Sequence, residues 1–283
     1  MPVERAIPAR TLATLAGSVL VAMLAAAGCA HALKEPPSLV ALAKGSAPGT
    51  PADVNSLLNA ADRAYARRPA TSDVRESSRI YLQAAAADPA RAEGLIGAAR
   101  TLVWLADHET DPAARERAAT EAVQAAQWCC RIAPERAACQ YWLGAGLGVQ
   151  ARERPSTGLS ALPKIEEAFK KAAAAEPGLD DGGPDRALAL LYLRAPGWPT
   201  GPGDPDLGLD HARRALALSP DYPPNHLALG EALAATGDAA GCASARTKAL
   251  ELAKKNREAS NPDPDADEWV REAEPSLKTC GPR

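Results

Sequence analysis

Ala87-Asp88-Pro89, Ile132-Ala133-Pro134, Ala175-Glu176-Pro177 and Leu218-Ser219-Pro220 are four similar stretches that decide the fold. Each closes an alanine-rich run with helical spacing of its apolar residues. Proline lacks a backbone N–H and pushes the preceding residue out of the α region, so each stretch marks a helix end. The successive prolines are 45, 43 and 43 residues apart. A period of this size predicts stacked helix pairs.

Small or aromatic residues stand eight and five positions before each proline. They are Tyr81 and Ala84, Ala126 and Cys129, Phe169 and Ala172, and Ala212 and Ala215. This pattern resembles the second helix of a tetratricopeptide repeat, in which a small residue lets two helices approach closely. The stretches 226–233 and 141–144 resemble the first helix. The repeat is usually about 34 residues long, so about ten extra residues per pair are expected in loops or longer helices.

We therefore predict an all-α solenoid of about five antiparallel helix pairs and a C-terminal capping helix. No run of alternating β-branched residues indicates a sheet. The domain is expected to span residues 51–283. The expected pairs are 52–68 with 72–87, 90–107 with 111–133, 135–152 with 161–176, 184–195 with 205–219, and 223–236 with 238–258, followed by a last helix near 265–279.

The N-terminus resembles a lipoprotein signal peptide. Residues 12–27 form an apolar run of signal-peptide length, too short to span a membrane comfortably. The run ends in Leu24-Ala25-Ala26-Ala27-Gly28-Cys29, which resembles a lipobox with Cys29 as the lipidated residue. We expect residues 1–29 to form a lipoprotein signal peptide with its lipobox, cleaved so that Cys29 becomes the mature N-terminus. Residues 30–50 are expected to form a flexible tether, and the protein is expected in the periplasm, anchored to the outer membrane or cell envelope. An ordinary secretory signal, with Cys29 incidental, remains the alternative.

Five further cysteines fit an exported protein. Cys129 and Cys130 end one predicted helix, and Cys139 begins the next. Cys129 occupies the small packing position of the repeat, so a Cys130–Cys139 disulfide is favoured. A second disulfide, Cys242–Cys280, would join the last helix to the last pair. Buried free thiols are the alternative for both.

The fourth pair carries the most specific motifs. They are Gly182-Gly183-Pro184 at a helix start, Ala195-Pro196-Gly197 in a loop, Gly203-Asp204 at a helix cap, and a final helix that contains Trp269. These features resemble the T component associated with tripartite ATP-independent periplasmic (TRAP) transporters. The resemblance implies a helical periplasmic lipoprotein, able to oligomerise around a pore and to meet a substrate-binding subunit.

No catalytic motif or metal-ligand spacing occurs, so neither enzyme activity nor a cofactor is expected. The four histidines are scattered, and His226 stands where the repeat usually has tryptophan, which favours packing. The net charge is −3 with both signs mixed along the chain, so no nucleic-acid surface is indicated. Gly182-Gly183-Pro184 is interpreted as a turn and helix start in preference to an anion site.

Tyr192, Trp198 and Pro199 are the candidate residues for binding a partner or ligand. Trp198 stands in a loop rich in proline and glycine, where it either covers the solenoid or forms a contact surface. Two functions follow from the sequence. In the first, the chain binds a subunit of a TRAP-type transport system, together with an apolar ligand. In the second, it is a general cell-envelope scaffold for protein interactions, without a transport role.

Overall fold

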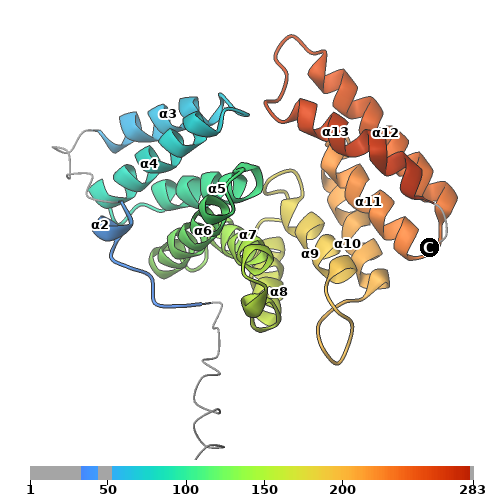
Figure 1. Cartoon of the computed structure of the whole chain (residues 1–283), viewed down its shortest axis with the longest axis horizontal. Coiled ribbons are helices and arrows are strands. Elements are labelled where there is room, and N and C mark those ends of the chain that lie inside the picture. Colours follow the sequence, from blue (N-terminus) through green and yellow to red (C-terminus); the bar gives the residue numbers. More distant parts are fainter. Residues whose placement is uncertain (1–32, 44–52, 281–283) are drawn as a thin grey trace, which may run out of the picture.

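A computed structural model describes residues 33–43 and 53–280 of the 283-residue chain. The described residues are mostly helical, and their only bridge between extended segments joins Gly197 and Gly203. The expected all-α architecture is confirmed. Figure 1 shows the helix pairs following one another along an arc.

The five expected pairs and the terminal helix are all present. The pairs are α3 (Val54–Tyr65) with α4 (Thr71–Ala87), α5 (Glu93–His108) with α6 (Pro112–Ile132), α7 (Ala137–Glu153) with α8 (Gly158–Ala175), α9 (Gly183–Arg194) with α10 (Pro205–Leu218), and α11 (Pro223–Ala235) with α12 (Ala239–Arg257). The chain ends in α13 (Ala266–Ser276) and the 3-10 turn η2 (Leu277–Thr279), and a second 3-10 turn, η1 (Pro155–Thr157), precedes α8.

Local chemistry explains why the helices begin and end where they do. The side chains of Asp111, Asp204 and Asp238 accept backbone hydrogen bonds at the starts of α6, α10 and α12. The second helices α4, α6, α8 and α10 each end one residue before the residue that precedes a proline, as the proline spacing predicts.

Small residues at the predicted spacing lie where helices meet. Ala126, Ala172 and Ala215 have no exposed surface, and Ala84 is 1% exposed. Glycines on the first helices leave space for aromatic rings from the neighbouring second helices. A Cβ atom on Gly97 would lie 2.3 Å from the ring of Tyr81, and one on Gly144 would lie 2.6 Å from the ring of Phe169. Each ring therefore packs directly against a helix backbone.

The first helices of the pairs form the inner layer of the arc. Successive first helices, such as α5 and α7 or α9 and α11, contact one another, whereas no comparable contact joins α4 to α6 or α6 to α8. Because the first helices lie closer to one another than the second helices do, the solenoid curves. Its concave side is built from the first helices.

The expected tether is partly wrong. Residues 33–43, here called the N-terminal segment, pack on the helical domain and include the short helix α2 (Leu39–Leu42). Trp128 Nε1 on α6 donates a 2.7 Å hydrogen bond to the carbonyl of Pro37, and Arg131 pairs with Glu35. Leu42 is 3% exposed. Proline-rich chain can lie extended along a helix as well as form a linker, and composition alone does not separate the two. Residues 44–50 of the expected tether lie outside the described residues.

One disulfide differs from the prediction. The structure joins Cys139 to Cys129, with a Cα–Cα distance of 5.3 Å, and leaves Cys130 as a free thiol. Neighbouring residues on a helix point about 100° apart, so only one of the two cysteines faces α7. The packing position held by Cys129 is the one nearest to α7, and this brings its sulfur within reach of Cys139. The second disulfide joins Cys242 on α12 to Cys280, as expected from the sequence.

The two ends of the arc meet through charged side chains. Arg68, after α3, makes a bidentate contact with Asp265 at the start of α13, with distances of 2.9 and 3.1 Å. His108 Nε2, at the end of α5, lies 2.9 Å from Glu268 Oε2 on α13. We call these contacts the closure ion pairs. Figure 1 shows the loop before α13 next to the end of α3.

Candidate functional site

The concave surface is hollowed where the third and fourth helix pairs meet. Helix α7 packs well against α5, and α9 packs against α11, but α7 and α9 contact each other at few positions. A cavity of about 750 Å³ opens between them. This volume falls within the range of small-molecule sites in proteins.

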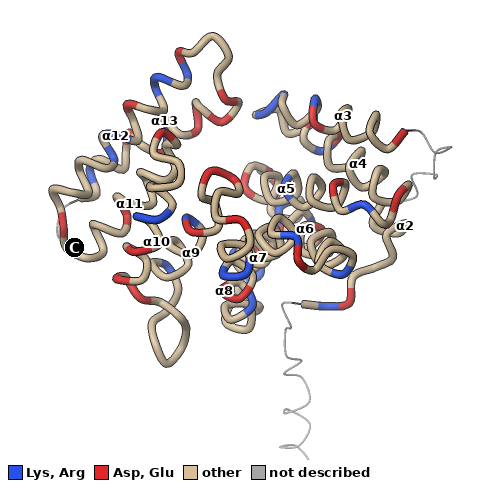
Figure 2. The backbone as a smooth tube through the Cα atoms, turned by 180° about the vertical axis from the view of Figure 1, so that it is seen from behind, with Lys and Arg blue, Asp and Glu red and all other residues tan. Residues whose placement is uncertain are grey.

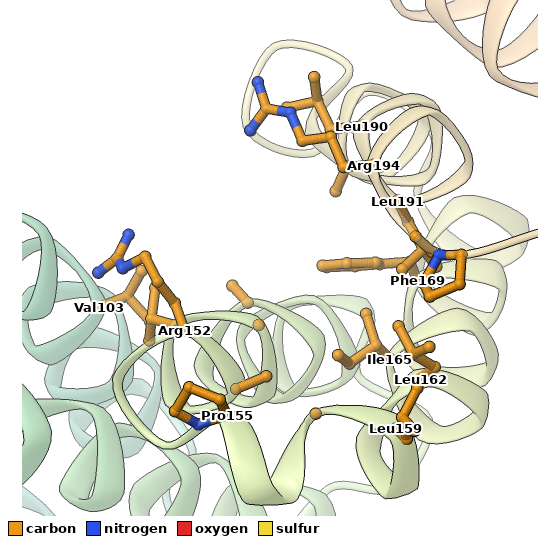
Figure 3. Close-up of a pocket in the computed structure, with 18 residues that line it drawn as sticks. Val103, Arg152, Pro155, Leu159, Leu162, Ile165, Phe169, Leu190, Leu191 and Arg194 are labelled. Carbon is orange, nitrogen blue, oxygen red and sulfur yellow. The ribbon is translucent and has the colours of Figure 1, made fainter. Parts of the chain in front are cut away.

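Apolar side chains line most of the cavity. Figure 3 shows Ile165 and Phe169 at its base, with Leu159 and Leu162 on one wall and Leu190 and Leu191 on another. The wall residues come from α8 and α9, while α7 contributes small residues, among them Ala145 and Gly148. A cavity walled by leucine and phenylalanine, without a carboxylate in its lining, is suited to an apolar group.

Two arginines flank the open side of the cavity, Arg152 from α7 and Arg194 from α9 (Figure 3). Both are already paired. Arg194 makes a bidentate contact with Glu231 at 2.9 and 2.7 Å, and Arg152 contacts Asp107 and donates to the carbonyl of Ala106 at 2.8 Å. Neither arginine therefore presents an uncompensated charge.

A buried polar network fixes the wall that α9 forms. Asp180, before α9, accepts from Tyr141 Oη at 2.7 Å and from Arg186 Nη2 at 2.9 Å. Arg186 also donates to Asn225 on α11 at 3.0 Å. Burial raises the pKa of Tyr141 well above its ordinary value, and the neighbouring Asp180 adds to this effect. The network joins α7, α9 and α11, so the cavity is held open by rigid elements.

Gly182-Gly183-Pro184 forms the turn and helix start that we expected. Gly182 has φ +76°, and a Cβ there would lie 2.9 Å from the carbonyl oxygen of Ala215. Asp180, Asp181 and Asp185 surround this helix start, and three carboxylates disfavour an anion.

The candidate binding residues separate in the structure. Tyr192 is 3% exposed; its hydroxyl donates to Glu166 at 2.8 Å and its ring stacks on His211 at 5.5 Å. Burial and the bond to Glu166 raise its pKa. Tyr192 is therefore a packing residue that does not line the cavity, and its predicted role in binding a partner or ligand is wrong. Trp198 is 90% exposed, and Pro199 is exposed beside it. Trp198 consequently does not cover the core.

The histidines of the described residues have structural partners. His211 Nδ1 lies 2.6 Å from Asp185, and His226 Nε2 lies 2.7 Å from the carbonyl of Pro220, so His226 packs as expected. Within residues 33–43 and 53–280, no group of histidine, cysteine and carboxylate side chains could hold a metal ion. His31, the signal sequence and Cys29 lie outside the described residues.

Among the residues that the structure describes, none of the helices combines the length and the apolar composition that a membrane crossing needs. Figure 2 shows acidic and basic residues interspersed over the helices. No basic stripe runs along the described part of the chain.

The sequence does not distinguish the cavity residues from other apolar positions. Leu159, Leu162, Leu190 and Leu191 look like ordinary positions of amphipathic helices. The one signal was Gly148, a glycine in a helix interior. A Cβ at this position would meet nothing within 4 Å, so the glycine faces the open cavity and no neighbouring backbone.

No model of a known protein family matches the chain, and no curated protein matches its sequence. Solved structures do match its fold. A thermophilic tetratricopeptide-repeat protein of Thermus thermophilus, TTC0263, is 19% identical, with a TM-score of 0.57 over 78% of this chain and 98% of that chain. MamA of Desulfovibrio magneticus RS-1, from residue 41 to its end, is 20% identical, with a TM-score of 0.46 over 73% of this chain and 97% of that chain. The match to TTC0263 shows that this chain has the fold of a tetratricopeptide-repeat solenoid.

Proposed function

We propose that this chain is a non-catalytic lipoprotein of the bacterial periplasm, anchored to the outer membrane through Cys29. Its helical repeats bind a solute-binding subunit of a TRAP-type transport system. An apolar ligand occupies the cavity between α7, α8 and α9. The observation that carries the binding role is this cavity of about 750 Å³, open on the concave side and lined by leucine, isoleucine and phenylalanine.

Two features support a binding role over chemistry. The cavity wall is fixed by the Tyr141–Asp180–Arg186 network, and rigid elements favour binding because less conformational entropy is lost. The arginines at the mouth are paired with carboxylates, so no reactive charge faces the ligand. The transporter link rests on the sequence resemblance of residues 182–204 and the final helix.

The cavity can be tested by filling it. In Gly148→Phe the new side chain enters open space, and replacing a helix-interior glycine favours folding by about 1 kcal/mol at most. The control is Gly178→Phe in the α8–α9 loop, where a Cβ also meets nothing within 4 Å. We expect Gly148→Phe to abolish binding of a long-chain alkyl probe measured by calorimetric titration, while Gly178→Phe binds as the wild type does. Equal binding by both variants would contradict the cavity as the ligand site.

The transporter link needs a separate experiment. The full-length protein should capture the solute-binding subunit encoded next to it, measured by co-purification and titration. If the wild-type protein binds no such subunit, the transporter proposal fails. The alternative, a general envelope scaffold, then stands.

A further inference from the structure

The loop between α9 and α10 carries an exposed apolar tip. Residues 195–203 read Ala-Pro-Gly-Trp-Pro-Thr-Gly-Pro-Gly and contain no charged side chain. Trp198 is 90% exposed, the largest exposed fraction among the large hydrophobic residues that the structure describes. Figure 2 shows the loop projecting from the helices without a charged residue.

The backbone of this loop is held in place. Gly203 N donates to the carbonyl of Pro196 at 2.8 Å, and Asp204 N donates to the carbonyl of Tyr192 at 2.9 Å. A Cβ on Gly201 would lie 3.1 Å from Leu162 Cδ1, so the loop also rests against α8. Trp198 is thus presented to the outside by a braced loop, and ordering it on binding costs little entropy.

The N-terminal segment limits how far the domain can stand from a lipid at Cys29. Because residues 33–43 pack on the domain, only residues 30–32 separate Cys29 from Leu33. Fully extended, the four steps of the chain from Cys29 to Leu33 reach about 14 Å. The tether expected from the sequence, about twenty residues long, would have allowed the domain to rotate freely.

The start of the N-terminal segment and the Trp198 loop lie at the same edge of the molecule. In Figure 1 both are at the lower edge, and the loop extends below the helices. A short anchor at this edge holds the same edge against the bilayer.

We propose that the Trp198 loop is a second membrane contact, in which the ring of Trp198 enters the lipid headgroup region while the lipid at Cys29 anchors the chain. This inference rests on the proposed lipidation. Tryptophan favours the interface between lipid and water because its ring is apolar and its N–H is polar. Asp204 and Asp206, at the base of the loop, stay in water and limit insertion to the tip. The lipid holds the chain at one point, and a second contact would fix the orientation of the domain on the membrane.

The five tryptophans allow a direct test, because Trp104 and Trp269 are buried, Trp128 and Trp142 are half-buried, and only Trp198 is exposed. The full-length protein, expressed with its signal sequence, is mixed with phospholipid vesicles whose acyl chains are brominated near the headgroups. Bromine quenches the fluorescence of tryptophan only at short range. We expect part of the wild-type emission to be quenched, and none of the emission of Trp198→Ala.

The control moves the tryptophan to the far end of α10. In Trp198→Ala with Leu218→Trp, the new ring replaces an exposed leucine, about 20 Å along the helix from the loop. We expect no quenching for this variant.

Each outcome bears on one proposal only. Flotation with the vesicles tests the anchor: a wild-type protein that does not float with them contradicts the lipidation at Cys29. Protein that floats but shows equal quenching with and without Trp198 overturns the membrane contact while the anchor stands. The membrane contact is also overturned if Trp198→Ala keeps its quenching and loses capture of the solute-binding subunit, since the loop would then be a protein contact.

Discussion

Removing the closure ion pairs should open the arc without unfolding the helix pairs. The variant is Asp265→Asn with Glu268→Gln, which removes the carboxylates that pair with Arg68 and His108 and leaves Asp263, 3.9 Å from Arg68, in place. Asp265 is the N-cap residue of α13, but its side chain makes no capping hydrogen bond, so the substitution leaves the helix start unchanged. Helix α13 stays attached to α12 by packing and by the Cys242–Cys280 disulfide.

The magnitude follows from the geometry of the two contacts. The Arg68 side chain is 9% exposed and its contact with Asp265 is bidentate, which places this pair at about 1.5–3 kcal/mol. The pair of His108 and Glu268, which are 20% and 31% exposed, contributes about 0.2–1 kcal/mol. We therefore expect the free energy of unfolding to fall by about 2–4 kcal/mol in the double variant.

The His108–Glu268 pair makes part of this effect depend on pH. Burial lowers the pKa of His108, but the hydrogen bonds to Glu268 and to the carbonyl of Trp104 outweigh it, so the pKa is raised. Both ring nitrogens face acceptors, which favours the doubly protonated ring. The hydrogen bond from His108 lowers the pKa of Glu268, although burial opposes this shift. Asp107 on α5 adds to the shift of His108, and Arg271 and Arg68 to that of Glu268; Glu272 on α13 also faces this pair.

The sign of the pH dependence follows. A raised histidine pKa stabilises the fold below the unfolded value of about 6.5, and this contribution is lost as the pH rises through the folded pKa. A lowered glutamate pKa stabilises above about 4.3 and is lost as the pH falls through the folded pKa. The stability difference between the wild type and Glu268→Gln should therefore be largest near about pH 5–6 and smaller at about pH 8.

The assay combines denaturant unfolding at both pH values with small-angle scattering. The radius of gyration should rise in the double variant. The control is Asp267→Asn, on the same turn of α13, whose side chain is 75% exposed and lies 4.0 Å from Arg257 of the neighbouring helix. The reasoning is refuted if the double variant and this control have the same stability and radius at both pH values.

Three further predictions concern packing and covalent chemistry. Ala215→Leu should lower the free energy of unfolding by about 1–3 kcal/mol, while Ala174→Leu on the exposed face should leave it nearly unchanged; equal denaturant midpoints would contradict the packing. Peptide mapping without reductant should recover Cys129 joined to Cys139, a closure that adds about 2.5–3 kcal/mol, and recovery of both as free thiols would exclude it. Cys29→Ala should move the protein from the membrane to the soluble fraction, and equal membrane association of both forms would exclude lipidation.

The helix boundaries could be predicted from the sequence because proline and aspartate act locally. Pro89, Pro134, Pro177 and Pro220 end helices whatever lies around them, and Asp111 and Asp204 cap helices through their own side chains. The helical register could be predicted as well, since Ala172 and Ala215 lie in contacts between helices and Ala174 is exposed.

Contacts between distant residues left no comparable signal. Arg68 and Asp265 are 197 positions apart, and an arginine or aspartate at a helix end is ordinary in any sequence. The repeat pattern places Cys129 at a packing position, which led to the prediction that Cys130 forms the disulfide. The packing position is, however, the one closest to the next helix, so the sulfur of Cys129 can reach Cys139. The cavity was unpredictable because it depends on the angle between two helix pairs.

The closure ion pairs and the cavity are connected through the spacing of the inner helices. The packing between successive first helices sets how sharply the arc bends from one helix pair to the next. Among the first helices, α7 and α9 pack against each other least. The ends of the arc meet through side chains, since neither α3 nor α5 packs its backbone against α13. These contacts are made by long side chains and not by an apolar interface. They therefore tolerate small changes in the curvature of the arc. A ligand that widens the α7–α9 step therefore works against ion pairs worth a few kcal/mol and leaves the packed helix pairs intact.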